Sequence, residues 1–409
     1  MTRLIPFRAL RPRPDLARQI ASVPYDVVDT EEARALALGN PLSFLHVVRS
    51  EIDLPANTHP YSDEVYAQAK RAFQDLQSSG SMQRDPDEAI YLYRQVMDGH
   101  AQVGVVACCP VDEYDQDKIK KHEKTRPDKE NDRTRHVMSI QANAGPVFLT
   151  YRGRDAINTH VKAIVEGEPP LYDFVAVDGI RHTVWKIKDP SPFLSEFAQV
   201  PFTYVADGHH RSASASRARA EMRKANPNHS GDEPYNRFLA VLFPADQLRI
   251  LPYNRVVHDL NGLTSAAFLK ALSAVFDSTG SSSGRPAARG EFAVYLEQSW
   301  HGFRAKESDL NQADSVARLD AAILQNRVLS PILGIDDPRT SDRISFVGGI
   351  RGTKELENRV NRAGSGVAFS MYPLGMDQLI NVADDNKILP PKSTWFEPKL
   401  RSGLIVHTF

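Results

Sequence analysis

The chain has 409 residues, of which 41% are hydrophobic and 25% are charged, a composition typical of a soluble globular protein with room for two or three domains. Its 50 basic and 51 acidic residues give a formal net charge of −1, which excludes a strong overall field that would attract nucleic acid or an anionic membrane. Any site for an anion must therefore be local.

The cysteines and the apolar runs indicate the compartment. Cys108 and Cys109 are adjacent in one apolar run, so their side chains point to opposite faces of a strand and offer neither a disulfide framework nor a zinc knuckle. No segment approaches the run of about 18 apolar residues that a membrane span requires, and the first residues carry charge and proline where a signal peptide has an apolar core. We expect a cytoplasmic protein without a membrane partner.

The first expected elements are two helices and a hairpin. TEEARALALGN predicts a helix with Thr30 as its N-cap and Gly39 as its stop. A second helix is expected over 63–77, where apolar side chains recur at helical spacing. Asp98-Gly99 stands between the strand-like runs YLYRQV and QVGVVACC, which predicts a tight turn without a functional role.

A densely charged passage follows, and it offers groups for binding phosphate. Lys129 and Arg133 could neutralise phosphate oxygens, while Glu123 or Asp132 could bind Mg²⁺ or accept a hydroxyl proton. The alternative is an exposed loop whose surface charges pair with one another.

The stretch VADGHHRSASA concentrates titratable side chains between an expected strand, PFTYVA, and an expected helix, RSASASRARAEMRKAN. A strand-to-helix turn presents free backbone N–H groups and the positive end of the helix dipole, which suit a phosphate or carboxylate. Asp207 would make the bend, His209 and His210 could exchange protons near neutral pH, and Arg211 could fork onto phosphate oxygens. The alternative is a helix N-cap with two solvated histidines.

The last third of the chain contains a composition break and a second basic segment. DSTGSSSGRPAARG, over 277–290, predicts a flexible linker or loop between a domain at 1–276 and a domain at 291–409. In the second domain we expect a hairpin around His301-Gly302 and a helix that ends near Pro331. In PPKSTWFEPK, Lys392, Ser393 and Lys399 could clamp phosphate, or the prolines could form a structural strap. Hairpins and helices without regular alternation favour an α+β, or mixed α/β, fold.

Three sets of motifs carry a resemblance to a known family. PYDV at 24–27 with NPLSFLHV, the HEKTRPDKENDR passage with DGHHR, and PPKSTWFEPKLRSGL together resemble the family catalogued as domain of unknown function 1015, over essentially the whole chain. DGHHR is also similar to the Asp-Gly-His-x-Arg element of free serine kinases with the ParB/sulfiredoxin-like fold, although His210 stands where threonine is expected. Those enzymes phosphorylate L-serine from a nucleotide or pyrophosphate.

The resemblance implies a ParB/sulfiredoxin-like core around the turn, with a second, smaller α+β unit. Asp207, His209 and Arg211 would line the phosphate site, and Glu123 or Asp26 would supply the carboxylate that activates the hydroxyl. The HEKT and PPKSTWFEPK segments should converge on the same turn, because a phosphoryl group in transfer needs positive charge on several sides.

The leading hypothesis is a phosphotransferase that converts a small hydroxylated metabolite, free L-serine, to O-phosphoserine with Mg²⁺ and ATP, ADP or pyrophosphate as the donor. One alternative is a phosphatase that acts on phosphoserine, with His210 as nucleophile or acid. The other is a non-enzymatic ParB-like protein that binds a ligand or DNA, although the balanced charge argues against a nucleic-acid partner. The sequence leaves the donor, the number of metal ions and the oligomeric state open.

Overall fold

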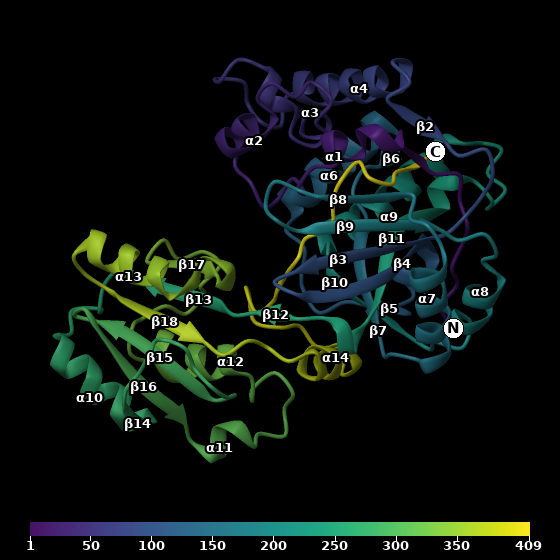
Figure 1. Cartoon of the computed structure of the whole chain (residues 1–409). Coiled ribbons are helices and arrows are strands. Elements are labelled where there is room, and N and C mark those ends of the chain that lie inside the picture. The colour runs from purple at the N-terminus through teal and green to yellow at the C-terminus, as the bar shows by residue number, and fades with distance from the viewer. The chain divides into compact units, whose positions relative to one another are not determined.

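The computed structural model describes all 409 residues and divides them into two units. Unit 1 comprises Met1–Leu248 and Pro398–Phe409, and unit 2 comprises Arg249–Glu397; in Figure 1, unit 2 runs from green to yellow. Both units combine helices with antiparallel or mixed sheets, so the predicted α+β class is confirmed.

The division of the chain differs from the predicted one. The expected linker at 277–290 lies inside unit 2, where Phe276–Ser281 forms strand β14 and pairs with β16 (Ser299–Ala305). β14 is the edge strand of its sheet and all its side chains after Phe276 are exposed, so it has no buried face to require apolar residues and tolerates the Gly and Ser that led us to expect a linker.

Unit 1 is organised around one eight-stranded sheet with the order β5-β10-β7-β11-β4-β3-β9-β8. The sheet is mixed, because β10 pairs with β5, and β11 with β7, in parallel, whereas every other neighbouring pair is antiparallel. Its strands are β3 (Tyr91–Met97), β4 (His100–Pro110), β5 (Ile119–Lys120), β7 (Val147–Tyr151), β8 (Tyr172–Val175), β9 (Arg181–Lys186), β10 (Thr203–Asp207) and β11 (Arg237–Pro244).

The hairpin between β3 and β4 confirms the predicted tight turn. Asp98 and Gly99 have φ angles of 50° and 76°, and two consecutive positive angles are those of a type I′ turn, which matches the twist of the strands. Cys108 and Cys109 lie in β4 and are both buried and free.

The helices of unit 1 confirm some expectations and correct others. The helices are α1 (Ala17–Ile20), α2 (Thr30–Ala37), α3 (Leu45–Val48), α4 (Asp63–Ser78), α5 (Val111–Asp115), α6 (Pro127–Ile140), α7 (Asp155–Gly167), α8 (Ser191–Phe197) and α9 (His209–Ala225). The expected helix over 63–77 is α4. The N-cap of α2 is Asp29 and not Thr30, because Asp29 and Glu32 form a capping box. The charged passage that carries Lys129, Asp132 and Arg133 forms the helix α6 from Pro127 onward, and this helix packs against α9.

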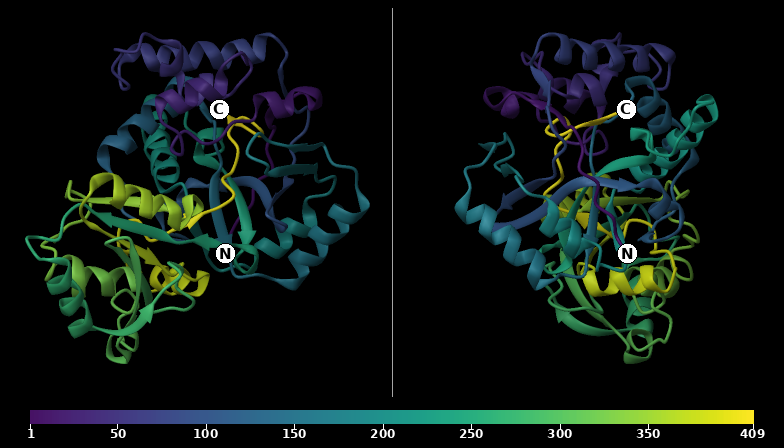
Figure 2. Two further views of the ribbon diagram at one scale, coloured as in Figure 1. Left: turned by 60° about the vertical axis from the view of Figure 1, so that its left-hand side comes forward. Right: turned by 90° about the vertical axis from the view of Figure 1, so that its right-hand side faces the viewer.

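The C-terminal segment returns to unit 1 and pairs with the N-terminal segment. Single bridges join Leu10 to Val406 and Ser22 to Ser402, and both views of Figure 2 show the yellow segment beside the purple one. Two small sheets complete the unit, β1 (Leu10–Pro12) with β2 (Met82–Arg84), and β6 (Ala142–Asn143) with β20 (His407–Thr408). This return brings Lys399 into unit 1.

Unit 2 contains a six-stranded sheet with the order β14-β16-β15-β18-β13-β17. Its remaining elements are β12 (Ile250–Leu251), β13 (Tyr253–Val257), β15 (Glu291–Leu296), β17 (Ile344–Gly348), β18 (Val367–Met371), β19 (Trp395–Phe396), α10 (Ser265–Val275), α11 (Glu307–Leu310), α12 (Asp320–Leu324), α13 (Gly352–Ala363) and α14 (Met376–Asp384). The predicted hairpin exists, but its turn lies at Glu297 and Gln298, which have positive φ angles. No helix of the chain combines the length and the apolar character needed to cross a bilayer.

The return of the C-terminal segment generates a stability prediction. Gly403 has a φ angle of 78°, and an added Cβ would lie 2.4 Å from the buried Phe44 ring. Gly403→Ala should therefore lower the free energy of unfolding by roughly 2–4 kcal/mol, through backbone strain and overpacking together. Urea denaturation measures the change.

Gly80→Ala is the matched control for this variant. Gly80 has a φ angle of 69°, but nothing lies within 4 Å of its added Cβ, so only the strain of roughly 1 kcal/mol should appear. Equal losses for the two variants would contradict the packing of Phe44 against the returning segment.

Candidate functional site

The predicted strand-to-helix turn is present at the end of β10. The strand ends at Asp207, Gly208 has a φ angle of 99°, and α9 begins at His209. Glycine is needed here for two reasons: few other residues adopt this backbone conformation, and an added Cβ would lie 3.1 Å from Arg211 Nε. The Arg211 side chain therefore folds back over the turn.

Asp207 lies between two cations that come from distant parts of the sequence. Its Oδ2 atom accepts a hydrogen bond from Arg211 Nη2 at 2.6 Å, and its Oδ1 atom accepts one from Lys399 Nζ at 3.3 Å. Burial alone would raise the pKa of this carboxyl, but Lys399 and Arg211 outweigh it and lower the pKa. Asp207 is thus ionised, and the three side chains together carry one net positive charge.

The helix start adds further donors to this cluster. No side chain caps the N-terminus of α9, so the first N–H groups of the helix lack the partner that a cap supplies. Arg211 donates to the Pro146 carbonyl, while its Nε atom is buried without a hydrogen-bond partner. Arg211 also lines a small cavity of about 40 Å³ together with Tyr25, Arg133 and Ser402, a space that suits a few water molecules or a small ion.

His209 is buried beside a second histidine and a carboxylate. Its Nε2 atom accepts a weak hydrogen bond from the His122 backbone N–H at 3.5 Å, and its Nδ1 atom lies 3.4 Å from Glu123 Oε2. The neutral ring therefore carries its proton on Nδ1, facing Glu123. The His122 ring lies 4.5 Å from that of His209, and neither of its ring nitrogens has a hydrogen-bond partner. Burial lowers the pKa of both histidines, for His209 to about 3.

His210 is less buried and engages the start of α6. Its Nε2 atom accepts a hydrogen bond from the Arg126 backbone N–H at 3.1 Å. Burial lowers the pKa of His210, and the charge of Asp26 opposes this shift. The charge of Asp26 also acts on the pKa of Arg211, which places this carboxylate in the electrostatic environment of the turn.

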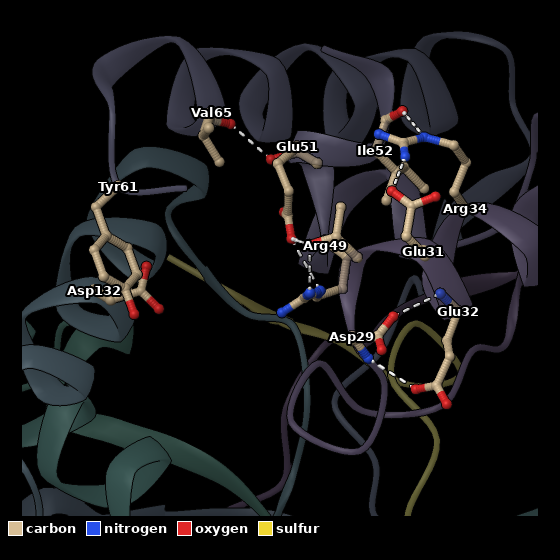
Figure 3. Close-up of polar contacts among 12 residues, drawn as sticks. Asp29, Glu31, Glu32, Arg34, Arg49, Glu51, Ile52, Tyr61, Val65 and Asp132 are labelled. Atoms are coloured by element: carbon tan, nitrogen blue, oxygen red, sulfur yellow. Dashed lines mark hydrogen bonds and ion pairs between the residues drawn. The ribbon is translucent and has the colours of Figure 1, made fainter. Parts of the chain in front are cut away.

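A second cavity, of about 210 Å³, lies beside the first and shares Tyr25 and Arg133 with it. Figure 3 shows two of its walls, with Arg49 and Glu51 facing Tyr61 and Asp132. Arg49 Nε lies 3.0 Å from Glu51 Oε1. The cavity thus presents both positive and negative groups.

The side chains of α6 supply the opposite wall of this second cavity. Arg133 Nη2 lies 2.8 Å from Asp132 Oδ2, and Tyr66 donates to Asp132 Oδ1 at 2.9 Å. Lys129 donates to the Tyr61 hydroxyl at 2.7 Å. The Arg133 guanidinium also lies 4.1 Å from the centre of the Tyr25 ring, and both residues line each of the two cavities.

The predicted site residues are brought together only in part. Arg211 and Lys399 meet at Asp207, and Lys129 and Arg133 line the neighbouring cavity. Lys392 and Ser393 belong to unit 2, where Lys392 Nζ lies 5.5 Å from the centre of the Tyr253 ring and Ser393 donates to the Pro390 carbonyl. Their role at the turn stays a prediction.

The predicted metal ligands do not form an assembled set. The chain contains no group of three or more His, Cys, Asp or Glu side chains that could hold a metal ion. Both carboxylate oxygens of Asp132 accept hydrogen bonds from protein donors, and its role as a metal ligand stays a prediction. Glu123, half-exposed beside His209, fits a single contact to a Mg²⁺ ion held mainly by phosphate oxygens.

Several residues of the site were not found from the sequence. Arg49, Glu51, Tyr61 and Tyr66 line the second cavity, and Ser402 lines the first. Arg49, Glu51, Tyr61 and Tyr66 are ordinary residue types outside the quoted motifs, and Ser402 lies in PPKSTWFEPKLRSGL without any pattern that singles it out.

The buried state of His209 predicts how stability depends on pH. The unfolded chain binds a proton at this ring below pH ~6.5, whereas the folded chain does so only near pH 3. The free energy of unfolding therefore decreases as the pH falls through this range, by up to about 1.4 kcal/mol per pH unit from this group. In His209→Gln the slope between about pH 6 and pH 4.5 should be shallower by that amount, as urea denaturation at a series of pH values measures. Parallel slopes for the two proteins would show that His209 is not buried in its neutral form.

Comparisons with known proteins assign the chain to a family. None of the curated proteins matches the chain. Similar solved structures include C-terminally truncated SbnI from Staphylococcus aureus (13% identity, TM-score 0.38, covering 71% of this chain and 82% of that one) and a free serine kinase variant in complex with AMP (12% identity, TM-score 0.34, covering 72% and 87%). A conserved hypothetical protein from Pyrococcus furiosus is also similar (13% identity, TM-score 0.33, covering 73% and 93%).

With TM-scores below 0.5, these likenesses establish neither the activity of this chain nor the details of its fold. The predicted ParB/sulfiredoxin-like core therefore rests on the DGHHR element and the motifs around it. The sequence pattern of the family described as protein of unknown function, DUF1015, matches residues 4–322. Since this match covers most of the 409 residues, the chain belongs to the DUF1015 family.

Proposed function

We propose that unit 1 is a phosphotransferase that phosphorylates a small hydroxylated metabolite, with free L-serine as the acceptor. The observation that carries the proposal is the cluster of Asp207, Arg211 and Lys399 at the uncapped start of α9. Two cations share one carboxylate there, next to N–H groups at the positive end of a helix dipole. The net positive charge of the three side chains and the N–H groups of the helix start would stabilise an anion there, and phosphate is the biological anion that such a site suits best.

The reaction needs positioning and charge neutralisation more than a nucleophilic side chain. The serine hydroxyl attacks the terminal phosphorus of ATP, ADP or pyrophosphate, the new O–P bond forms as the bond to the leaving phosphate oxygen breaks, and the hydroxyl proton passes to a carboxylate. Arg211 and Lys399 would stabilise the charge on the phosphoryl oxygens. Mg²⁺, held by donor phosphates and by Glu123, would add to this neutralisation.

Two carboxylates are candidates for the proton acceptor. Glu123 lies beside His209 Nδ1, and Asp26 exerts its charge on both Arg211 and His210. Either one could take the proton if the acceptor hydroxyl lies within hydrogen-bond reach of it. Substituting the carboxylate that accepts the proton should stop the reaction, so variants of Glu123 and Asp26 distinguish the two candidates.

The second cavity presents positive and negative side chains, which suit the α-carboxylate and the ammonium group of a free amino acid. Arg49 or Arg133 could pair with the α-carboxylate, and Glu51 or Asp132 could accept hydrogen bonds from the ammonium group. Because Tyr25 and Arg133 line both cavities, a serine bound in this way would lie next to the cavity that Arg211 lines.

A phosphohistidine mechanism is less consistent with the geometry. The Nε2 lone pair of His210 is occupied by the Arg126 N–H, and His209 is buried with its proton on the nitrogen that faces Glu123. A histidine nucleophile needs a free lone pair in line with phosphorus. We therefore favour direct transfer over the phosphatase alternative.

Arg211→Ala should reduce the formation of O-phosphoserine by roughly two to three orders of magnitude, because it removes a charged donor that stabilises the transition state. The assay incubates the protein and Mg²⁺ with serine and, separately, ATP, ADP or pyrophosphate, and measures phosphoserine by mass spectrometry. Arg181→Ala is the control, since this exposed arginine of β9 pairs with Asp173 and lines neither cavity. If the protein releases phosphate from phosphoserine but transfers none to serine from any of the three donors, it is a phosphatase and the proposal is wrong.

Glu123→Gln and Asp26→Asn identify the base. Each variant keeps the size of the side chain and removes its basicity, so the true base should lose roughly 100-fold or more in kcat. The other variant should retain most of the activity. If both variants turn over at the wild-type rate, neither Glu123 nor Asp26 accepts the proton and both candidate assignments are wrong.

A further inference from the structure

Unit 2 contains a buried cation without a carboxylate partner. Arg255 lies in the central strand β13 and is 4% exposed. Its guanidinium donates to two backbone carbonyls, those of Tyr253 and Pro391, the latter at 3.5 Å. None of the ion pairs of the chain includes Arg255. The acid whose charge acts on the pKa of Arg255 is Asp320, which is half-buried and accepts a hydrogen bond from the Gly290 N–H.

Arg401 provides an internal comparison. Arg255 and Arg401 are the only two arginines of the chain that are buried to this extent, each with 4% exposure. Arg401 has the usual compensation, because its guanidinium pairs with the carboxylate of Asp178. A buried charge without such a pair costs free energy, and burial lowers the pKa of Arg255 to about 10.

Arg255 lines a cavity of about 340 Å³ within unit 2. The walls are mainly apolar and include Ala321, Leu329, Phe346, Pro390 and Pro391. Two acids also line it, but each has a partner: Asp336 accepts a hydrogen bond from Ser330, and Asp337 pairs with Arg339. Arg255 is thus the one cation of the cavity that is not paired with a carboxylate.

We propose that this cavity binds a small organic monocarboxylate, whose carboxylate pairs with Arg255 and whose apolar body packs against Phe346, Leu329 and the two prolines. A carboxylate matches the planar fork of a guanidinium. A single unpaired cation balances a single negative charge, and the two acids of the lining would repel a dianion such as phosphate. The cavity is also of the size and apolar character typical of small-molecule sites.

This site is independent of the reaction proposed for unit 1. It gives a role to the first half of the PPKSTWFEPK segment, because Pro390 and Pro391 form part of its wall. The second half of the same segment carries Lys399 to Asp207.

Isothermal titration calorimetry of the full chain tests the proposal, with benzoate as the probe and hexanoate as a second carboxylate. We expect saturable binding of at least one of them. Binding should weaken by roughly 10- to 100-fold in Arg255→Met, which keeps the volume but removes the charged hydrogen bonds. Arg343→Met is the matched control, because Arg343 is a surface arginine of unit 2 paired with Asp259; it should bind as the wild type does.

A cavity-filling variant and two further probe ligands distinguish the contribution of the charge of Arg255 from that of the apolar walls. Ala321→Trp fills the cavity and leaves Arg255 unchanged, so it should abolish binding even if Arg255→Met does not fold. Benzyl alcohol lacks the charge and inorganic phosphate lacks the apolar body, so both should bind more weakly than benzoate. The proposal is overturned if neither carboxylate binds the wild type, if Arg255→Met or Ala321→Trp binds as the wild type does, or if phosphate binds more tightly than both carboxylates.

Discussion

The carboxylate of Asp207 holds the candidate site together, because both Arg211 and Lys399 contact it. Arg211 reaches it from the first turn of α9, and Lys399 reaches it from a segment 192 residues later in the chain. Gly208 permits the backbone bend and leaves room for the guanidinium. Removing the carboxylate would leave two buried cations with less compensation, which is costly in a site of low dielectric. The same cations, shared by one acid, retain a net positive charge for an anion.

The site depends on the return of the C-terminal segment to unit 1. The bridges from Leu10 to Val406 and from Ser22 to Ser402 anchor that segment beside the N-terminal one, so backbone pairing holds the residues that directly follow Lys399. The chain therefore leaves unit 1 after Leu248 and returns at Pro398. The PPKSTWFEPK segment joins the two units, with Pro390 and Pro391 at the Arg255 cavity and Lys399 at Asp207.

The sequence predicted those features that local residues determine. The turns at Asp98 and Asp207 follow from the elements on either side of each, and α4 follows from apolar spacing. Other features depend on partners far away in the sequence. Charge without apolar spacing concealed α6, and the Gly and Ser residues of β14 resembled a linker because an exposed strand face has no apolar alternation. The second cavity joins Arg49 and Glu51 to Asp132, a convergence that no local pattern contains.

The central claim is that Arg211 and Lys399 hold a phosphoryl group at the start of α9, and a crystal structure of the full chain grown with serine, Mg²⁺ and pyrophosphate tests it most directly. The account predicts phosphate oxygens within hydrogen-bond distance of both side chains and of the first N–H groups of α9, with serine in the cavity lined by Arg49 and Asp132. Pyrophosphate bound elsewhere in the chain, with no phosphate oxygen near Arg211 or Lys399, would contradict it.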